Sequence, residues 1–195
     1  SQRIAKYWPV TVWGLLKHLV GASQSARQLR GARRLEGIGI RTPVVVDPPR
    51  VVVESGRRLV RVELAYVPGA TVTEWLESES GGAEDRRSLA SQLGDCTRRI
   101  AEAGYLHRDL RPSNIVVESG RTGPVAWLID PVGMRRCTDR VVAIARMLNR
   151  LDTQVRRRRA ITGGAWRLVL REAVGGLSAS DRRAVFERLR AHRPR

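Results

Sequence analysis

The first third of the chain alternates short apolar runs with turn residues, a pattern that predicts a small antiparallel sheet. β-Branched residues dominate these runs, and Pro48-Pro49 and Ser55-Gly56 separate three of them. The predicted strands cover residues 3–7, 44–46, 50–54 and 59–67. Pro68-Gly69 closes the last strand, because proline lacks a donor for a strand ladder and glycine permits a tight turn.

Helical spacing of apolar residues dominates the rest of the chain. A helix is expected from the caps at Ser23 and Ser25 through Leu35, because Leu29, Ala32 and Leu35 recur three residues apart before Gly37. Further helices are predicted over residues 71–78, 84–103, 139–151, 166–174 and 180–189. Their expected core positions are Leu89, Leu93, Ile100, Val142, Ile144, Ala145 and Leu148. A β-rich beginning therefore precedes a mainly helical remainder.

Residues 8–20 carry a separate apolar stripe. Trp13, Leu16, Leu19 and Val20 lie at near-helical spacing, with Lys17 and a histidine between them. Such a stripe packs on its own domain or rests on a membrane surface, and the spacing leaves both alternatives open.

Composition limits the class of protein. With 195 residues and 42% hydrophobic content, the chain can bury one sizeable core or two small lobes. Cys96 and Cys137 are far apart and have no C-x-x-C partner, so we expect two buried thiols in a reducing compartment. No apolar run approaches the roughly 20 residues that span a bilayer, and no secretory leader is evident. These features predict a cytoplasmic protein.

The net charge of +17 attracts anionic partners such as nucleic acid, lipid headgroups or phosphorylated sugars. Lys6 and Lys17 are the only lysines, and every other cation is arginine, which equally indicates a coding bias. Residues 156–159 are four consecutive arginines, either a solvated face or a contact with an acidic lipid surface.

One polar loop, from His107 to Asn114, matches the protein-kinase catalytic loop H-R-D-L-x-x-x-N at every fixed position. Phosphoryl transfer needs a carboxylate beside the acceptor hydroxyl and an oxygen ligand for Mg²⁺ a few residues later. Asp109 is the candidate for the first role and Asn114 for the second, with His107, Arg108 and Arg111 as further catalytic residues. The strand-like run at 115–117 behind the loop disfavours a chance match.

A second acid follows at the end of the apolar run 125–130, which a turn at 119–124 separates from 115–117. This spacing predicts a hairpin that places Asp130 at a strand end, where its carboxylate can hold Mg²⁺. Asp130 then takes the metal role of the kinase D-F-G aspartate, and the alternative is that Asp130-Pro131 only opens a turn. Pro131 and Val132 replace the Phe-Gly part, so a flipping Phe switch is not expected.

Lys6 lies in the first predicted strand, as the phosphate-binding lysine of the V-A-I-K strand does, although a solvated edge lysine is the alternative. Together with the apolar insert, Ser-x-x-Ala-Arg-x-x-Arg from Ser23 and Gly39-Ile40-Arg41-Thr42-Pro43, this order resembles the bacterial lipopolysaccharide kinase (Kdo/WaaP-type) family of the protein-kinase-like superfamily. The family's helix usually carries a Glu that pairs with the strand lysine. Gln28 stands at that position here, and its neutral amide can still accept a hydrogen bond from Lys6.

The resemblance implies an α+β, two-lobed protein-kinase-like fold, with a small antiparallel-sheet N-lobe over residues 1–69 and a mainly helical C-lobe over 70–195. It also makes residues 63–69 the hinge, whose backbone at Glu63, Ala65 and Val67 would receive adenine. No Gly-rich loop precedes Lys6, so the N-lobe is apparently truncated: either the chain is a fragment or the nucleotide site is open on one side.

The expected function is therefore transfer of the γ-phosphoryl group of ATP, with Mg²⁺, to a hydroxyl. The resemblance implies a sugar of a lipopolysaccharide-type glycolipid as acceptor and peripheral contact with the anionic inner membrane, and it does not favour nucleic acid as a partner. The absence of an A-P-E segment after Asp130 favours a compact small-molecule or glycolipid kinase. A protein Ser/Thr kinase and a catalytically silent pseudokinase that acts as a binding module are the alternatives.

Overall fold

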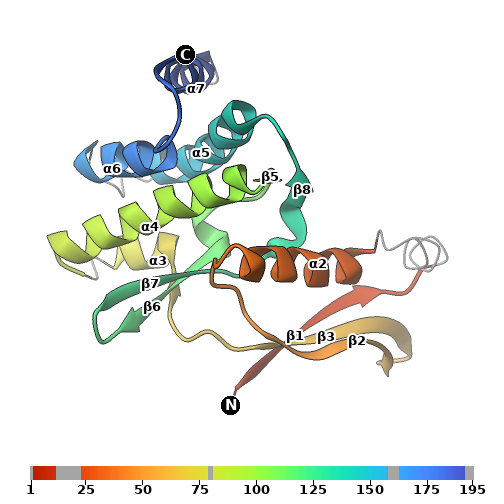
Figure 1. Cartoon of the computed structure of the whole chain (residues 1–195). Coiled ribbons are helices and arrows are strands. Elements are labelled where there is room, and N and C mark those ends of the chain that lie inside the picture. Colours follow the sequence, from red (N-terminus) through yellow and green to blue (C-terminus); the bar gives the residue numbers. More distant parts are fainter. Residues whose placement is uncertain (1, 12–22, 79–80, 158–162, 192–195) are drawn as a thin grey trace.

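A computed structural model of the chain describes residues 2–11, 23–78, 81–157 and 163–191 (Figure 1). Its first sheet has three antiparallel strands in the order β1-β3-β2. The strands are β1 (Arg3–Pro9), β2 (Val45–Glu54) and β3 (Arg57–Ala65). Val62 and Leu64 of the central strand are buried and, being two residues apart, lie on the same face of the sheet. The sheet predicted from the β-branched runs is confirmed.

The prediction of separate strands over 44–46 and 50–54 was wrong, because β2 is one strand that runs through Pro48-Pro49. Its register against β3 shifts between Val45 and Asp47 and again between Asp47 and Arg50. Proline cannot donate to a strand ladder, but an edge strand with irregular pairing tolerates it. β2 pairs only with β3 among the described strands.

Helix α2 (Gln24–Gly37) begins at Ser23, whose side-chain oxygen accepts a hydrogen bond from the Ala26 N–H at 3.2 Å. In Figure 1 this helix lies between the three-stranded sheet and the helical body. Ala32 and Leu35 are buried as predicted, whereas Leu29 is only half-buried. The apolar positions 13, 16, 19 and 20 of the predicted stripe lie outside the described residues, and residues 8–9 belong to β1.

The helical body is organised around α4 (Ala83–Glu102), which packs against α6 and the hairpin. The other helices are α3 (Val72–Glu77), α5 (Arg140–Arg157), α6 (Gly163–Ala173) and α7 (Ala179–Ala191). Leu89, Leu93 and Ile100 of α4 are buried, as are Ile144, Ala145 and Leu148 of α5. Val142 is half-buried. All five predicted later helices are therefore present, with ends shifted by a few residues.

Two further small sheets, built from short strands, lie between the helices in the sequence. The predicted hairpin is β6 (Ile115–Gly120) with β7 (Gly123–Leu128). Sequence patterns did not predict β4 (Ala70–Thr71), β5 (Tyr105–His107) or β8 (Met134–Arg136), which have only two or three residues each. β4 pairs with β6, and β5 pairs with β8.

Small antiparallel sheets and a helical body confirm the predicted mixed α+β class. The lobe boundary at residue 69 stays a prediction. No helix in the described part of the chain is long and apolar enough to cross a membrane.

Both cysteines are free and only partly buried, not fully buried as expected. Burial of the Cys96 thiol raises its pKa to about 12.

Candidate active site

The predicted catalytic loop runs from the end of β5 through a 3₁₀ turn, Pro112–Asn114, to the start of β6. The Asp109 carbonyl accepts from the Arg111 N–H at 2.9 Å and from the Asn114 side-chain amide at 2.9 Å. These bonds fix the loop through the backbone of Asp109 and leave its carboxylate 43% exposed. Arg111 Nη2 lies 3.4 Å from that carboxylate. The loop therefore presents one oriented acid beside one cation.

The His107 ring forms hydrogen bonds to the backbone of both acidic residues of the site, Asp109 and Asp130. Its ring is fully buried, and Nδ1 accepts from the Asp109 N–H at 3.2 Å. Because Nδ1 is then the acceptor, Nε2 carries the proton and donates to the Asp130 carbonyl at 2.8 Å. Burial lowers the pKa of His107, and the bond to the Asp130 carbonyl opposes that shift. His107 is thus a neutral positioning residue that holds Asp109 and Asp130 in a fixed relation.

The stability of the fold should fall in mild acid because of His107. Its pKa lies below the ordinary value of 6.5 when folded, so below about pH 6.5 the unfolded chain binds a proton that the native chain does not. The free energy of unfolding should then decrease as pH drops, by at most about 1.4 kcal/mol per pH unit for this group. Urea unfolding from pH 7.5 to 5.5 measures the slope. His107→Gln should flatten it, and an identical slope in parent and variant would contradict the assignment.

Asp130 lies two residues after the end of β7 and close to Lys6 of β1. The Lys6 ammonium is 3.5 Å from the Asp130 carboxylate and donates to the Ile129 carbonyl at 3.3 Å. The Ile129 N–H bonds to the Asn114 carbonyl at 3.0 Å, so the residue before Asp130 is tied to the predicted metal ligand at the end of the 3₁₀ turn. Residues far apart in the sequence, Lys6, Asn114 and Asp130, are thereby brought to one place.

The residues present fit a magnesium nucleotide. A carboxylate and an amide oxygen are the hard oxygen ligands that Mg²⁺ takes together with phosphate oxygens. Asn114 uses its amide N–H₂ on the Asp109 carbonyl, so its side-chain oxygen stays available as a ligand. Lys6 supplies a cation for phosphate. No cluster of three His, Cys, Asp or Glu occurs within the described residues, and a kinase-type site needs none, since the phosphates complete the ligand set.

Asp130→Asn should weaken binding of the magnesium nucleotide itself, because the carboxylate is the charged ligand of the predicted metal site. The variant keeps the size of the side chain but loses its charge, so we expect about tenfold weaker affinity for Mg·ATP. Fluorescence titration with a labelled ATP analogue, with and without Mg²⁺, measures the loss. Unchanged Mg²⁺-dependent affinity would contradict the metal assignment.

Gln28 is buried on the inner face of α2, with only 1% of its surface exposed. Its side-chain oxygen has no hydrogen-bond partner within the described residues, because the Lys6 ammonium contacts Asp130 and the Ile129 carbonyl instead. A buried acceptor without a partner is energetically costly. If Lys6 moved toward α2, a hydrogen bond from its ammonium group to the Gln28 oxygen would therefore be favourable. The predicted Lys6–Gln28 hydrogen bond is not formed in this structure.

Glu63, the first residue of the predicted hinge, belongs to the three-stranded sheet. Glu63 lies inside β3, opposite Ala5 on one side and Asp47 on the other, so its backbone is surrounded by strands. Its side chain forms ion pairs with Arg3, Arg50 and Arg61, and the hydrogen bond from Arg3 lowers the Glu63 pKa. Glu63 is therefore a sheet residue in this structure, and its nucleotide contact stays a prediction.

The chain leaves the sheet at Ala65, the last residue of β3, whose N–H bonds to the Val44 carbonyl at 2.8 Å. Val67 is buried two residues later. The adenine-binding roles of Ala65 and Val67 stay predictions.

The segment after α2 ties the sheet region to β7. Thr42 donates to the Leu128 carbonyl at 2.8 Å, and the Leu128 N–H bonds to the Arg41 carbonyl at 2.9 Å. These contacts fix the end of β7, two residues before Asp130. The sequence points to residues 41–43 only through the family resemblance. Both contacts involve backbone carbonyl groups, and contacts of this kind leave no recognisable motif in a sequence.

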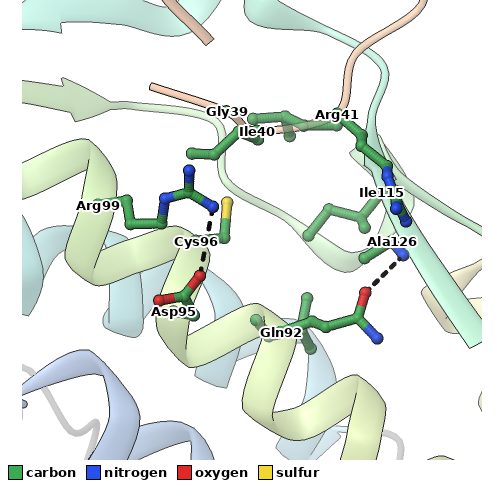
Figure 2. A pocket seen from close by; sticks show the side chains of 11 residues that line it. Gly39, Ile40, Arg41, Gln92, Asp95, Cys96, Arg99, Ile115 and Ala126 are labelled. Carbon is green, nitrogen blue, oxygen red and sulfur yellow. Dashed lines mark hydrogen bonds and ion pairs between the residues drawn. The ribbon is translucent and has the colours of Figure 1, made fainter. Parts of the chain in front are cut away.

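A cavity of about 220 Å³ lies behind β7, between α4 and the segment 39–41 (Figure 2). Its apolar lining includes Leu93, Ile115 and Leu128. Its polar groups are largely engaged by the chain: Arg99 bonds to the Ile38 carbonyl and pairs with an aspartate of α4, and Gln92 accepts from the Ala126 N–H at 2.9 Å. None of the predicted site residues lines this cavity, which is a packing junction behind the active site.

Comparison with known proteins gives two kinds of match. The model of the lipopolysaccharide kinase (Kdo/WaaP) family matches residues 6–172. The serine/threonine-protein kinases AfsK of Streptomyces coelicolor and Streptomyces griseus are each 32% identical over 143 residues, which are 71% of this chain and 17% of those proteins. A probable bifunctional tRNA threonylcarbamoyladenosine biosynthesis protein of Methanothermobacter thermautotrophicus is 29% identical over 99 residues, 51% of this chain and 16% of that protein.

Proposed function

The chain belongs to the lipopolysaccharide kinase (Kdo/WaaP) family, and from this premise we propose that it phosphorylates a sugar hydroxyl of a lipopolysaccharide-type glycolipid, with ATP as donor and Mg²⁺ as cofactor. Its protein-kinase-like fold and its activity as a kinase-type phosphotransferase follow from the family. The acceptor and the cofactor are our proposal, since the chain matches only 17% of the length of its curated kinase relatives.

The site residues divide the work of the reaction. Asp109 accepts a hydrogen bond from the acceptor hydroxyl and orients it toward the phosphoryl group, and Arg111 offsets charge beside that carboxylate. Asn114 and Asp130 would hold Mg²⁺, and Lys6 would contact the nucleotide phosphates. Mg²⁺ supplies charge neutralisation of the phosphates when bound. His107 keeps the two acids in register through its two ring nitrogens.

The short connection after Asp130 is the observation that carries the acceptor proposal. A 3₁₀ turn, Pro131–Gly133, leads directly into β8, and α5 begins at Arg140. Protein kinases place a longer activation segment between the metal-binding aspartate and the A-P-E motif. Here only the 3₁₀ turn, β8 and the irregular residues 137–139 lie between Asp130 and α5, which leaves little room for a comparable peptide platform. A compact acceptor such as a sugar fits this geometry better.

A location at the cytoplasmic face of the inner membrane completes the proposal. The net charge of +17 favours contact with anionic lipid headgroups, each cation near such a surface contributing about 1 kcal/mol. This location would bring the site to a membrane-embedded glycolipid.

Phosphate transfer from γ-labelled ATP tests the proposal. The protein is incubated with Mg²⁺ and either a lipopolysaccharide-type glycolipid with free sugar hydroxyls or a Ser/Thr-rich peptide pool at equal hydroxyl concentration. Label in the lipid fraction, dependent on Asp109, supports the proposed acceptor. Label only in the peptides would overturn it and favour protein Ser/Thr kinase activity, the second candidate, which the 32% identity to two AfsK kinases supports.

A further inference from the structure

Helix α2, the catalytic loop and β8 come together near Asp109, and each of them carries at least one arginine. Arg27 of α2 donates to the Val132 carbonyl at 3.1 Å, and the Arg108 N–H bonds to the Gly133 carbonyl at 3.1 Å. Leu106 of β5 pairs with Arg135 of β8, which places Arg135 next to the catalytic loop. The segment 132–135 therefore links α2 to that loop. The 3₁₀ turn Pro131–Gly133, which leads into β8, packs against α2.

Arg27, Arg30, Arg108 and Arg135 form what we call the arginine cluster. Burial lowers the pKa of Arg27, and the positive charges of Arg135, Arg108 and Arg30 lower it further, in that order. Asp109 acts in the opposite direction. The other three cations therefore act on Arg27, in keeping with its bond to the segment 132–135, the place of Arg30 one helical turn later on α2 and the pairing of β8 with β5.

The cluster lacks acidic partners. None of its four arginines forms an ion pair with Asp or Glu within residues 2–11, 23–78, 81–157 and 163–191. In the three-stranded sheet, by contrast, Glu63 pairs with Arg3 and Arg61. Arg30, Arg108 and Arg135 are exposed, so their guanidinium groups are accessible to a ligand. A group of mutually repelling cations that the chain does not neutralise is suited to binding an anion.

Resting on the proposed function, we propose that the acceptor carries a phosphate group and that the arginine cluster binds this group while the adjacent hydroxyl lies at Asp109. Guanidinium groups match phosphate with paired, charge-assisted hydrogen bonds, which a hydroxyl acceptor alone does not offer. The cluster is then a specificity determinant: it selects a phosphorylated sugar over a neutral sugar and fixes the direction from which the hydroxyl approaches the carboxylate.

Binding of inorganic phosphate tests the cluster without any turnover. Calorimetric titration is performed with Mg²⁺ and a non-hydrolysable ATP analogue present, so that the predicted nucleotide site is filled. Arg30→Gln and Arg135→Gln remove exposed members of the cluster, and Arg136→Gln is the matched control, because neighbouring strand residues point to opposite faces. We expect each cluster variant to bind phosphate about fivefold more weakly and the control to stay within about twofold of the parent. Equal losses in all three variants would show a general charge effect and overturn the cluster.

A second measurement compares a neutral sugar with its monophosphate as acceptors. We expect Arg135→Gln to raise KM for the monophosphate about fivefold with little change in kcat, and to leave KM for the neutral sugar unchanged. Equal KM values of the parent for both sugars would overturn the phosphorylated acceptor. If the parent phosphorylates neither sugar, the acceptor class of the proposed function fails, and the phosphate titration still decides whether the cluster binds an anion.

Discussion

Asp109→Asn should reduce phosphoryl transfer by about 10²–10⁴-fold, the range expected when a catalytic base is lost. The amide keeps the shape of the side chain but cannot accept a proton, and it also loses the ion pair with Arg111. The loop itself should persist, because Asn114 and the Arg111 N–H bond to the backbone carbonyl of residue 109. Affinity for Mg·ATP should change by less than about twofold, since this carboxylate serves the acceptor hydroxyl.

Single-turnover kinetics with labelled ATP, together with a nucleotide titration, separates the two effects. Glu187→Gln is a matched control, because it removes one carboxylate from an exposed position on α7. It should transfer phosphate at the parent rate. If Asp109→Asn also transfers at that rate, Asp109 is not the base. If instead it loses nucleotide affinity as strongly as Asp130→Asn does, the division of roles between the two acids is wrong.

Local chemistry made part of this site predictable. The order His107, Asp109 and Asn114 appears as a contiguous motif because one loop must supply both the base and a metal ligand. The hairpin that delivers Asp130 was predictable for a similar reason, since the strands and their turn are adjacent in the sequence. The family match over residues 6–172 confirms the resemblance that these motifs indicated.

Contacts between distant segments were not predictable in the same way. The pairing of Lys6 with Asp130 spans most of the chain, and helical or strand spacing carries no information about it. Arg27 stands in the Ser-x-x-Ala-Arg-x-x-Arg segment, but Arg135 belongs to no motif, and the two come into one neighbourhood only when β8 pairs with β5. β8 itself has three residues, too few for a periodic signal. Tertiary packing thus decides which of many arginines surround Asp109.

Gly31→Ala should destabilise the contact that joins α2 to the segment after Asp130. A Cβ at position 31 would lie 2.8 Å from both the carbonyl carbon and the Cβ of Pro131, and closer still to its carbonyl oxygen. Backbone atoms in a 3₁₀ turn cannot rotate away as a flexible side chain can, so α2 must shift as a body. Alanine favours a helix over glycine by about 1 kcal/mol, but overpacking typically costs about 1–3 kcal/mol, so the net effect should be destabilising.

Gly37→Ala provides the matched control, because the same substitution in the same helix meets no atom within 4 Å. Urea unfolding should therefore show a lower midpoint for Gly31→Ala and an unchanged or higher midpoint for Gly37→Ala. Gly31→Ala should also bind Mg·ATP more weakly, because a shift of α2 against Pro131 displaces Asp130, the preceding residue, from Lys6. Equal stability and equal nucleotide affinity in the two variants would show that the α2 contact with Pro131 does not position the metal-binding aspartate.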